Sequence, residues 1–221
     1  MAASPDTNWL AKIEGKSFVN VSIDSANGDA INTEEFLQAA RSLVTLFDIL
    51  GATTFNRVIA DLNTNIEKVQ KRKDAAPAES ETLQDLVRNE LKSGQHKATE
   101  GLLWLVRGLD FTVQALRHNL DNPSSQLSVS FNQAYGTTLK PHHNFVVKGV
   151  FSAAMGFCPY RTTFFRKVDD KNAKAADNEN EKVDPEVEAR VSAGLSREVE
   201  ALERVVKILK TFQATPEAQW K

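Results

Sequence analysis

Apolar side chains recur at intervals of three and four residues along most of the chain from Thr33 onward, the spacing of helices that bury one face. The first stripe predicts a helix that starts at Thr33, a good N-cap residue, and stops at Gly51. A second helix carries the stretch ADLNTNIEKV, residues 60–69. No segment shows the convincing alternation of a strand, so the pattern predicts an all-α protein.

The rest of the chain continues in the same way. Further helices are predicted over residues 81–92, 98–120, 128–139 and 142–156, and after the helix-starting run Asp184-Pro185-Glu186. The helix over 98–120 is apolar almost all round, which is typical of a central, buried helix. Residues 73–80 are a linker, and residues 169–183 are a charged surface loop.

Residues 1–32 lack clear periodicity and contain several turn-forming residues, so we expect a loosely packed N-terminal arm. Residues 33–221 are predicted to form a single domain, because a chain of 221 residues is long enough for one sizeable core.

Composition narrows the class of protein. Hydrophobic residues make up 41% and charged residues 25%, as in ordinary globular proteins, and the net charge of -2 gives no reason to expect a nucleic-acid partner. The single cysteine, Cys158, excludes an internal disulfide and fits a reducing compartment. No signal peptide and no membrane-spanning stretch is recognisable. We therefore expect a soluble cytoplasmic protein that acts as a monomer.

Catalytic signatures are missing. The sequence contains no G-x-S-x-G, no P-loop, no H-E-x-x-H and no pair of C-x-x-C motifs. His142 and His143 fall in a predicted helix, where neighbouring side chains point about 100° apart, so they do not easily share a metal ion. The sequence predicts no enzyme, no metal and no cofactor.

Three polar residues of the second helix, Asp61, Asn65 and Lys68, fall within a wedge of roughly 60° along the edge of its apolar stripe. Such a row is placed to form the mouth of a pocket that is apolar inside. On spacing alone, a solvated helix edge explains the row better, and Trp104 taken alone is better explained as part of the core.

Several short blocks together resemble the glycolipid transfer protein family, and they occur in the family's order over about residues 33–167. The blocks are Phe47-Asp48-Ile49-Leu50-Gly51, Phe55 followed by Asp61-x-x-x-Asn65-x-x-Lys68, Leu103-Trp104-Leu105-Val106-Arg107-Gly108-Leu109-Asp110-Phe111, Ala134-Tyr135 through Leu139-Lys140-Pro141-His142-His143-Asn144-Phe145, Phe151-Ser152-Ala153-Ala154-Met155 and Pro159-Tyr160. The chain is most similar to the fungal heterokaryon-incompatibility branch.

This resemblance implies a two-layer helical sandwich of about eight helices and a non-enzymatic carrier or sensor of glycosphingolipids. It implies that the sugar headgroup is held by four residues: Asp61, Asn65, Lys68 and Trp104. It further implies that His143, with Asp61, holds the ceramide amide, whereas His142 is a bystander. An ionised aspartate only accepts hydrogen bonds, lysine only donates and asparagine does both, which suits a rim of sugar hydroxyls.

The ceramide chains are expected in an apolar pocket between the helix layers. Its candidate lining residues are Phe47, Phe55, Val58, Phe111, Leu139, Phe151, Met155 and Phe164. Phe145, where animal relatives often have tryptophan, is the candidate for transient membrane contact. Three alternatives stay open: a ceramide 1-phosphate carrier of the same fold, a helical protein-interaction module, and a hydrolase with an unrecognised site.

Overall fold

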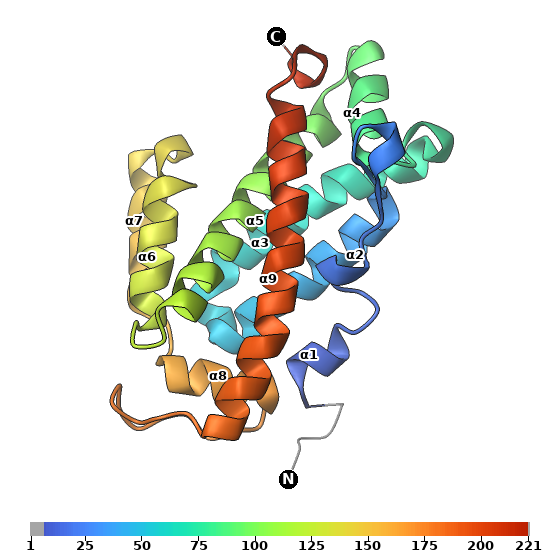
Figure 1. The fold of residues 1–221 in the computed structure, drawn as a ribbon. Coiled ribbons are helices and arrows are strands. Elements are labelled where there is room, and N and C mark those ends of the chain that lie inside the picture. Colours follow the sequence, from blue (N-terminus) through green and yellow to red (C-terminus); the bar gives the residue numbers. More distant parts are fainter. Residues whose placement is uncertain (1–6, 221) are drawn as a thin grey trace.

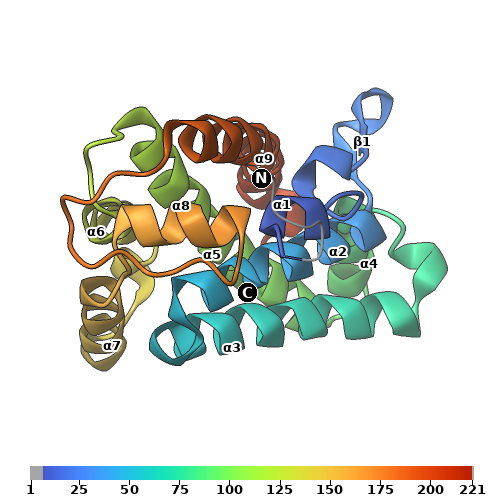
Figure 2. The ribbon, with the colours of Figure 1, turned by 90° about the horizontal axis from the view of Figure 1, so that it is seen from below.

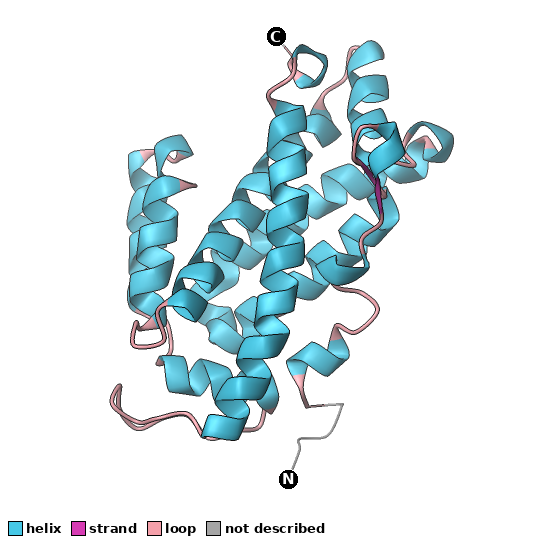
Figure 3. Ribbon diagram, in the orientation of Figure 1, coloured by secondary structure: helices cyan, strands magenta, loops and turns pink. Residues whose placement is uncertain are grey.

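The computed structural model describes residues 7–220, and most of them are helical (Figures 1 and 3). The α-helices in this range are α1 (Trp9–Lys12), α2 (Thr33–Val44), α3 (Leu46–Ala75), α4 (Leu83–Lys92), α5 (Lys97–Asp121), α6 (Leu127–Thr137), α7 (Phe145–Gly156), α8 (Arg161–Asp169) and α9 (Pro185–Gln213). The short 3-10 helices are η1 (Phe18–Asn20), η2 (Ser25–Asn27), η3 (Pro77–Glu79), η4 (Lys140–His142) and η5 (Pro216–Ala218). Two short antiparallel strands, β1 (Ile23–Asp24) and β2 (Ala30–Ile31), pair Ile23 with Ile31.

Helix α5 is the centre of the fold. It packs against α3, α6 and α9, and Figure 2 shows α3 and α9 on opposite sides of it. Most of its apolar side chains are buried, among them Leu102, Leu105 and Phe111. The prediction of a central, buried helix from its apolar composition is confirmed.

The predicted first helix is two helices. Its N-cap is Asn32, whose side chain accepts a hydrogen bond from the Glu35 N–H, and α2 ends at Val44. The Thr45 hydroxyl donates to the Ser42 carbonyl at 2.6 Å, a local bond that competes with continuation of the helix. Gly51, the predicted stop, instead lies inside α3 at φ 117° and ψ 91°, where it kinks the helix in a conformation open essentially to glycine. The prediction of one helix from Thr33 to Gly51 is therefore wrong in its boundaries.

The expectation of a loosely packed arm before Thr33 is wrong for residues 7–32, and residues 1–6 lie outside the described residues. Trp9 and Phe18 are buried in the core. The Trp9 indole N–H donates to the Thr45 hydroxyl at 2.8 Å, and the Phe18 N–H donates to the Glu198 carboxylate at 3.0 Å. These buried residues lie in short helices and turns at irregular intervals, so the sequence before Thr33 shows neither a helical nor a strand-like hydrophobic pattern. The extent of the single domain, 33–221, stays a prediction.

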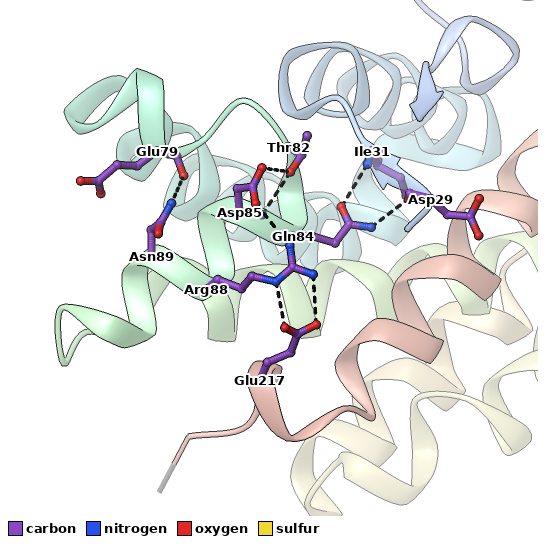
Figure 4. A network of polar contacts seen from close by, with 9 residues as sticks. All are labelled: Asp29, Ile31, Glu79, Thr82, Gln84, Asp85, Arg88, Asn89 and Glu217. Carbon is purple, nitrogen blue, oxygen red and sulfur yellow. Dashed lines mark hydrogen bonds and ion pairs between the residues drawn. The ribbon is translucent and has the colours of Figure 1, made fainter. Parts of the chain in front are cut away.

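Helix α4 ties both ends of the chain to the core (Figure 4). The buried Gln84 side chain accepts from the Ile31 N–H and donates to the Asp29 carbonyl, each at 3.0 Å. One turn further, the Arg88 guanidinium donates to both oxygens of Glu217 in η5, at 2.9 and 3.1 Å. Segments that are distant in the sequence are thus held on one ten-residue helix.

The start of α5 is fixed by an acid from α4. Glu90 is buried, and its carboxylate accepts hydrogen bonds from the Ala98 N–H at 2.8 Å and from the Thr99 N–H and hydroxyl at 2.7 Å each. A carboxylate is stabilised at a helix N-terminus, where free N–H groups carry partial positive charge. The helix's own cap residue, His96, makes no side-chain cap bond, so Glu90 takes that role.

Helices α3 and α5 approach each other closely at Gly101. A Cβ atom at this position would lie 2.8 Å from the Lys68 Cβ and 3.2 Å from the Asn65 carbonyl oxygen. These distances are too short for ordinary contact, so a glycine is needed for the two helices to pack at this separation.

We predict that Gly101→Ala lowers the free energy of unfolding by about 1–3 kcal/mol, because the added methyl must push α3 away from α5. Urea denaturation followed by circular dichroism measures the change. The control is Gly136→Ala on the exposed side of α6, where a Cβ would have no neighbour within 4 Å. This control should be neutral or stabilising by up to about 1 kcal/mol. Equal stability of the two variants would contradict the close-packing argument.

Candidate functional site

A cavity of about 270 Å³ lies between α3, α5 and the segment that runs from the end of α6 into α7. Its lining residues are Arg57, Val58, Asp61, Leu62, Thr64, Asn65, Trp104, Gly108, Phe111, Leu139, His143, Val147 and Phe151. Four residues singled out from the sequence, Asp61, Asn65, Trp104 and His143, therefore share one cavity although they come from three parts of the chain.

The polar edge of the cavity is built on α3. Asp61 is 44% exposed at its side chain and pairs with Arg57 one turn earlier, at 3.3 Å between Nε and Oδ1. The Asn65 amide donates to the backbone carbonyl of Asp61 at 2.9 Å. Both side chains sit at the boundary between solvent and an apolar wall, as the wedge beside the apolar stripe predicts.

Trp104 of α5 is half-buried and forms one wall. The His143 ring stacks on it with centroids 6.1 Å apart and planes inclined by 17°. On the same indole, the Arg107 guanidinium lies 4.7 Å from the ring centroid and the His142 ring meets it edge-on at 6.3 Å. Trp104 is thus partly exposed beside cationic and aromatic groups at the cavity, and it is not sealed in the core.

The two histidines do not lie in the predicted helix over 142–156. His142 ends η4, His143 is extended, and α7 starts only at Phe145 with Asn144 as its N-cap, since the Asn144 side chain accepts from the Val147 N–H. The preceding Pro141 falls in the first turn of η4. In the part of the chain that the structure describes, no group of three or more histidine, cysteine or acidic side chains could hold a metal ion.

His143 is held from two sides. Its Nδ1 lies 3.1 Å from the Tyr135 hydroxyl, and its ring is 4.7 Å from that of Phe151. Burial lowers the pKa of His143, the charge of Asp61 opposes this shift, and His142 and Lys148 add to it. The lowered pKa favours the neutral imidazole, and in the tautomer whose Nδ1 accepts the tyrosine O–H, Nε2–H is the donor that faces a ligand.

Lys68 does not line the cavity. Its ammonium lies 3.7 Å from a carboxylate oxygen of Glu100, which precedes Trp104 by one turn of α5. The lysine therefore continues the polar row of α3 past the cavity mouth, on the side where α3 meets α5 at Gly101.

The predicted hydrocarbon pocket divides into two groups. Val58, Phe111, Leu139 and Phe151 line the cavity. Phe47, Phe55, Met155 and Phe164 do not line it and are almost completely buried in the core. A chain of ring contacts connects the two groups, from Phe111 to Phe131 at 5.5 Å, to Phe55 at 6.0 Å and to Phe47 at 5.6 Å. The cavity wall is therefore continuous with the aromatic core.

Helix α7 and the residues after it carry an apolar outer surface. Phe145 is 90% exposed, and the other exposed large apolar residues here are Val146, Val150, Phe157 and Tyr160. Among the described residues, no helix is both long and apolar enough to cross a membrane. Cys158, beside this surface, is partly buried, and burial raises its pKa to about 12, so it is a protonated thiol at neutral pH.

Three residues at or behind the cavity wall had no predicted role: Arg57 lines the cavity, Tyr135 contacts His143, and Arg107 lies over Trp104. Arg57 carries a signal that could have identified it, because it precedes Asp61 by four residues, the spacing of a helical ion pair. Arg107 follows Trp104 by three residues on the same helix. Tyr135 belongs to a block of the family resemblance but has no comparable local signal, since its partner His143 lies beyond η4.

Comparison with known proteins decides the family. A family model described as glycolipid transfer protein matches residues 31–170. A glycolipid transfer protein of Aureobasidium melanogenum is 47% identical over 220 residues, which covers all of both chains. The chain belongs to the glycolipid transfer protein family. The resemblance deduced from the short blocks is confirmed.

Solved structures agree. The crystal structure of HET-C2, a fungal glycolipid transfer protein, matches with a TM-score of 0.84 at 48% identity, over 96% of this chain and all of the other. The glycolipid-transfer fold of FAPP2, described as selecting simple glycosphingolipids, matches with a TM-score of 0.77 at 31% identity, over 89% and 90% of the two chains. The expected all-α fold is confirmed.

Two further relatives are less similar to this chain. Pleckstrin homology domain-containing family A member 8 of Bos taurus is 31% identical, but the match covers 96% of this chain and only 41% of that protein. Mouse ceramide-1-phosphate transfer protein, at 18% identity and a TM-score of 0.71 over 93% and 94% of the two chains, shares the fold. The fold alone therefore does not separate sugar from phosphate headgroups.

We predict that His143 titrates below the ordinary histidine pKa of about 6.5 and that Asp61→Asn lowers its pKa further, because the carboxylate favours the charged imidazolium. Histidine-ring NMR chemical shifts measured against pH follow the four histidines of the chain separately. Glu67→Gln, at an exposed acid of the same helix, serves as the control and should leave the His143 titration unchanged. A rise in the His143 pKa on Asp61→Asn would contradict the placement of the Asp61 carboxylate near the His143 ring.

Proposed function

We propose that this protein binds glycosphingolipids and moves them between membranes, or senses them, without chemical change. The observation that carries the proposal is the single cavity in which Asp61, Asn65, Trp104 and His143 form a polar end and apolar side chains form the rest. Membership of the glycolipid transfer protein family supports it. The role needs no covalent step, cofactor or second subunit, and we assign the chain to the cytoplasm as a monomer.

The polar end suits a sugar joined to an amide. The flat indole of Trp104 can stack on the C–H face of a sugar ring, while Asp61 accepts and Asn65 both accepts and donates hydrogen bonds to its hydroxyls. Lys68 reaches a hydroxyl by giving up its pair with Glu100, a long contact between partly exposed side chains. The Nε2–H of neutral His143 is a donor for the ceramide carbonyl, and Asp61 accepts the amide N–H.

The apolar end serves the ceramide chains. Exposing a sixteen-carbon chain to water costs on the order of 13 kcal/mol at about 0.8 kcal/mol per methylene, so unassisted exchange between bilayers is slow. A cavity of about 270 Å³ lies near the lower end of ligand pockets, so two chains need more room. We infer that the lipid enters by displacing the rings that continue inward from Phe111, which would bring Phe55 and Phe47 into the lining.

Charge favours a sugar over a phosphate headgroup. Of the described residues that line the cavity, Arg57 is the one permanently charged cation and is paired with Asp61, and Lys68 beside the cavity is paired with Glu100. A phosphate monoester needs charge-assisted bonds from several cations, and the carboxylate of Asp61 would repel it. A ceramide 1-phosphate carrier is therefore the second candidate.

We predict that vesicles containing a fluorescent monohexosyl ceramide lose it to acceptor vesicles in the presence of the protein. Trp104→Ala and Asp61→Val should each reduce the rate at least about tenfold, because each removes an interaction with the headgroup and leaves partly buried polar groups unpaired. Fluorescence dequenching measures the rate.

The matched control is Glu67→Val, at an acid of the same helix that is also ion-paired across one turn but faces solvent. It should transfer at the wild-type rate. Equal transfer of ceramide 1-phosphate and the monohexosyl lipid would reject the sugar assignment, and release of free sugar would point to an enzyme.

The apolar surface of α7 is the proposed membrane contact. Phe145 is the most exposed of its large apolar side chains, and Phe157 is 73% exposed near the other end of the helix. Exposed aromatic residues of this kind insert into the interfacial region of a bilayer.

We predict that the double variant Phe145→Asp/Phe157→Asp slows transfer at least about tenfold at low vesicle concentration, since two charges oppose insertion. Binding of a short-chain, water-soluble glycolipid should stay unchanged. Val19→Asp, at an exposed apolar residue of η1, is the control and should have no effect on transfer. Undiminished transfer by the double variant would exclude this surface as the docking face.

A further inference from the structure

A second hollow, of about 640 Å³, lies away from the lipid cavity, between α1, the junction of α2 and α3, and the end of α8. Figure 2 shows α1 beside one end of α8 at this place. Its lining residues are Thr7, Trp9, Lys12, Ile13, Lys16, Arg41, Ser42, Thr45, Asp48, Ile49, Lys167 and Lys171. It shares no lining residue with the lipid cavity.

The hollow is strongly basic in a chain that is slightly acidic. Four lysines and Arg41 face a single carboxylate, Asp48, so five positive charges against one negative charge leave a local excess of four. The whole chain carries a net charge of -2. The cations come from three stretches of the chain, residues 12–16, 41 and 167–171, and only the tertiary structure brings them together.

The lysines of this hollow have no acid bound to them among residues 7–220: the ion pairs of this range include none of Lys12, Lys16, Lys167 and Lys171. The nearest acid of α8, Asp169, is engaged elsewhere, since Arg190 donates to its two oxygens at 2.8 Å each. Arg41 donates to the neutral Gln70 side chain at 2.7 Å. The charges are therefore open to an anionic ligand.

The frame that holds these cations is fixed. Trp9 forms a buried floor, and its indole N–H is bonded to Thr45 at the junction of α2 and α3. The Asn8 amide donates to Asp169 at 3.3 Å, and the Lys171 N–H donates to the Thr7 carbonyl at 3.0 Å. These bonds join α1 to both neighbouring elements, so the hollow is a built feature and not a chance gathering of surface lysines.

We propose that this hollow binds a compact organic polyphosphate, either a soluble molecule or the headgroup of a phosphorylated lipid. Lysine ammonium groups bind phosphate as point charges, and several of them facing one space favour a ligand with more than one phosphate. The volume fits a ring-sized carrier, and the floor of Trp9, Ile13 and Ile49 offers an apolar face for that ring.

Two probes test the proposal and separate the two sources of the ligand. Inositol hexakisphosphate, titrated by calorimetry, represents the soluble source. Phosphatidylcholine vesicles with and without a phosphatidylinositol bisphosphate, used in sedimentation, represent the lipid source. Binding should weaken steeply with added salt, because it rests on charges near the surface.

The diagnostic variant is Lys12→Gln/Lys167→Gln, which should weaken binding about tenfold or more by removing two charge-assisted contacts. Lys92→Gln/Lys97→Gln is the matched control, since it removes the same net charge from exposed lysines at the last residue of α4 and the first of α5 and should change binding less than about twofold. Asp48→Asn should tighten binding about twofold to threefold, which keeps the proposal testable if the lysine variant fails to fold.

Loss of inositol hexakisphosphate binding in the Lys12/Lys167 variant supports a soluble ligand, and loss of vesicle binding alone supports a lipid headgroup. Absence of binding to both probes, or equal weakening by both lysine variants, overturns the proposal. Glycolipid transfer between uncharged vesicles should be the same in all these variants. A transfer defect in the Trp104 or Asp61 variants therefore tests the proposed lipid site and not the basic hollow.

Discussion

The candidate lipid site depends on the close approach of α3 to α5. Asp61, Asn65 and Lys68 lie on one of these helices and Trp104 on the other. The contact at Gly101 sets their separation, and Glu90 fixes where α5 begins. A change of one helix turn or a few tenths of an ångström at this contact would alter which side chains face each other. Residues with no polar atom at the site thus determine its geometry.

The charged groups near the cavity have partners that a ligand can replace at small cost. Asp61 pairs with Arg57 and Lys68 pairs with Glu100, whereas the bond of His143 to the Tyr135 hydroxyl can stay in place when a ligand binds. Partly exposed ion pairs of this kind are worth about 0–1 kcal/mol, so exchanging them for hydroxyl or amide partners is nearly neutral. Fully buried polar groups would be far more costly to leave unpaired. Because Asp61 and Lys68 lie at the edge of the cavity, their side chains have hydrogen-bonding partners both with and without a bound ligand.

Most helices could be predicted from the sequence, because the spacing of apolar residues indicates which face of a helix is buried. Helix α5, which is apolar almost all round, is an example. Features without a repeating hydrophobic pattern could not be predicted: Trp9 and Phe18 anchor short segments, and the break between α2 and α3 falls at Thr45, where a local side-chain bond forms. The meeting of Asp61 with Trp104 could not be deduced from spacing, since it depends on how two helices pack. The resemblance to a family supplied it. Nor could spacing separate Phe111, on the cavity wall, from Phe55, in the core behind it.

Helix α8 connects the apolar surface of α7 with the basic hollow. Tyr160, at the end of the apolar surface of α7, directly precedes α8, and Lys167 of the basic hollow lies seven residues later, about 10 Å along a helix with 1.5 Å rise per residue. An anionic lipid headgroup in the hollow would therefore hold one end of α8 near the bilayer and restrict how α7 meets it. A soluble polyphosphate would instead cancel the charge of the hollow, leaving the apolar surface of α7 as the main attraction to a membrane. The identity of the anion thus decides whether the basic hollow promotes or opposes docking.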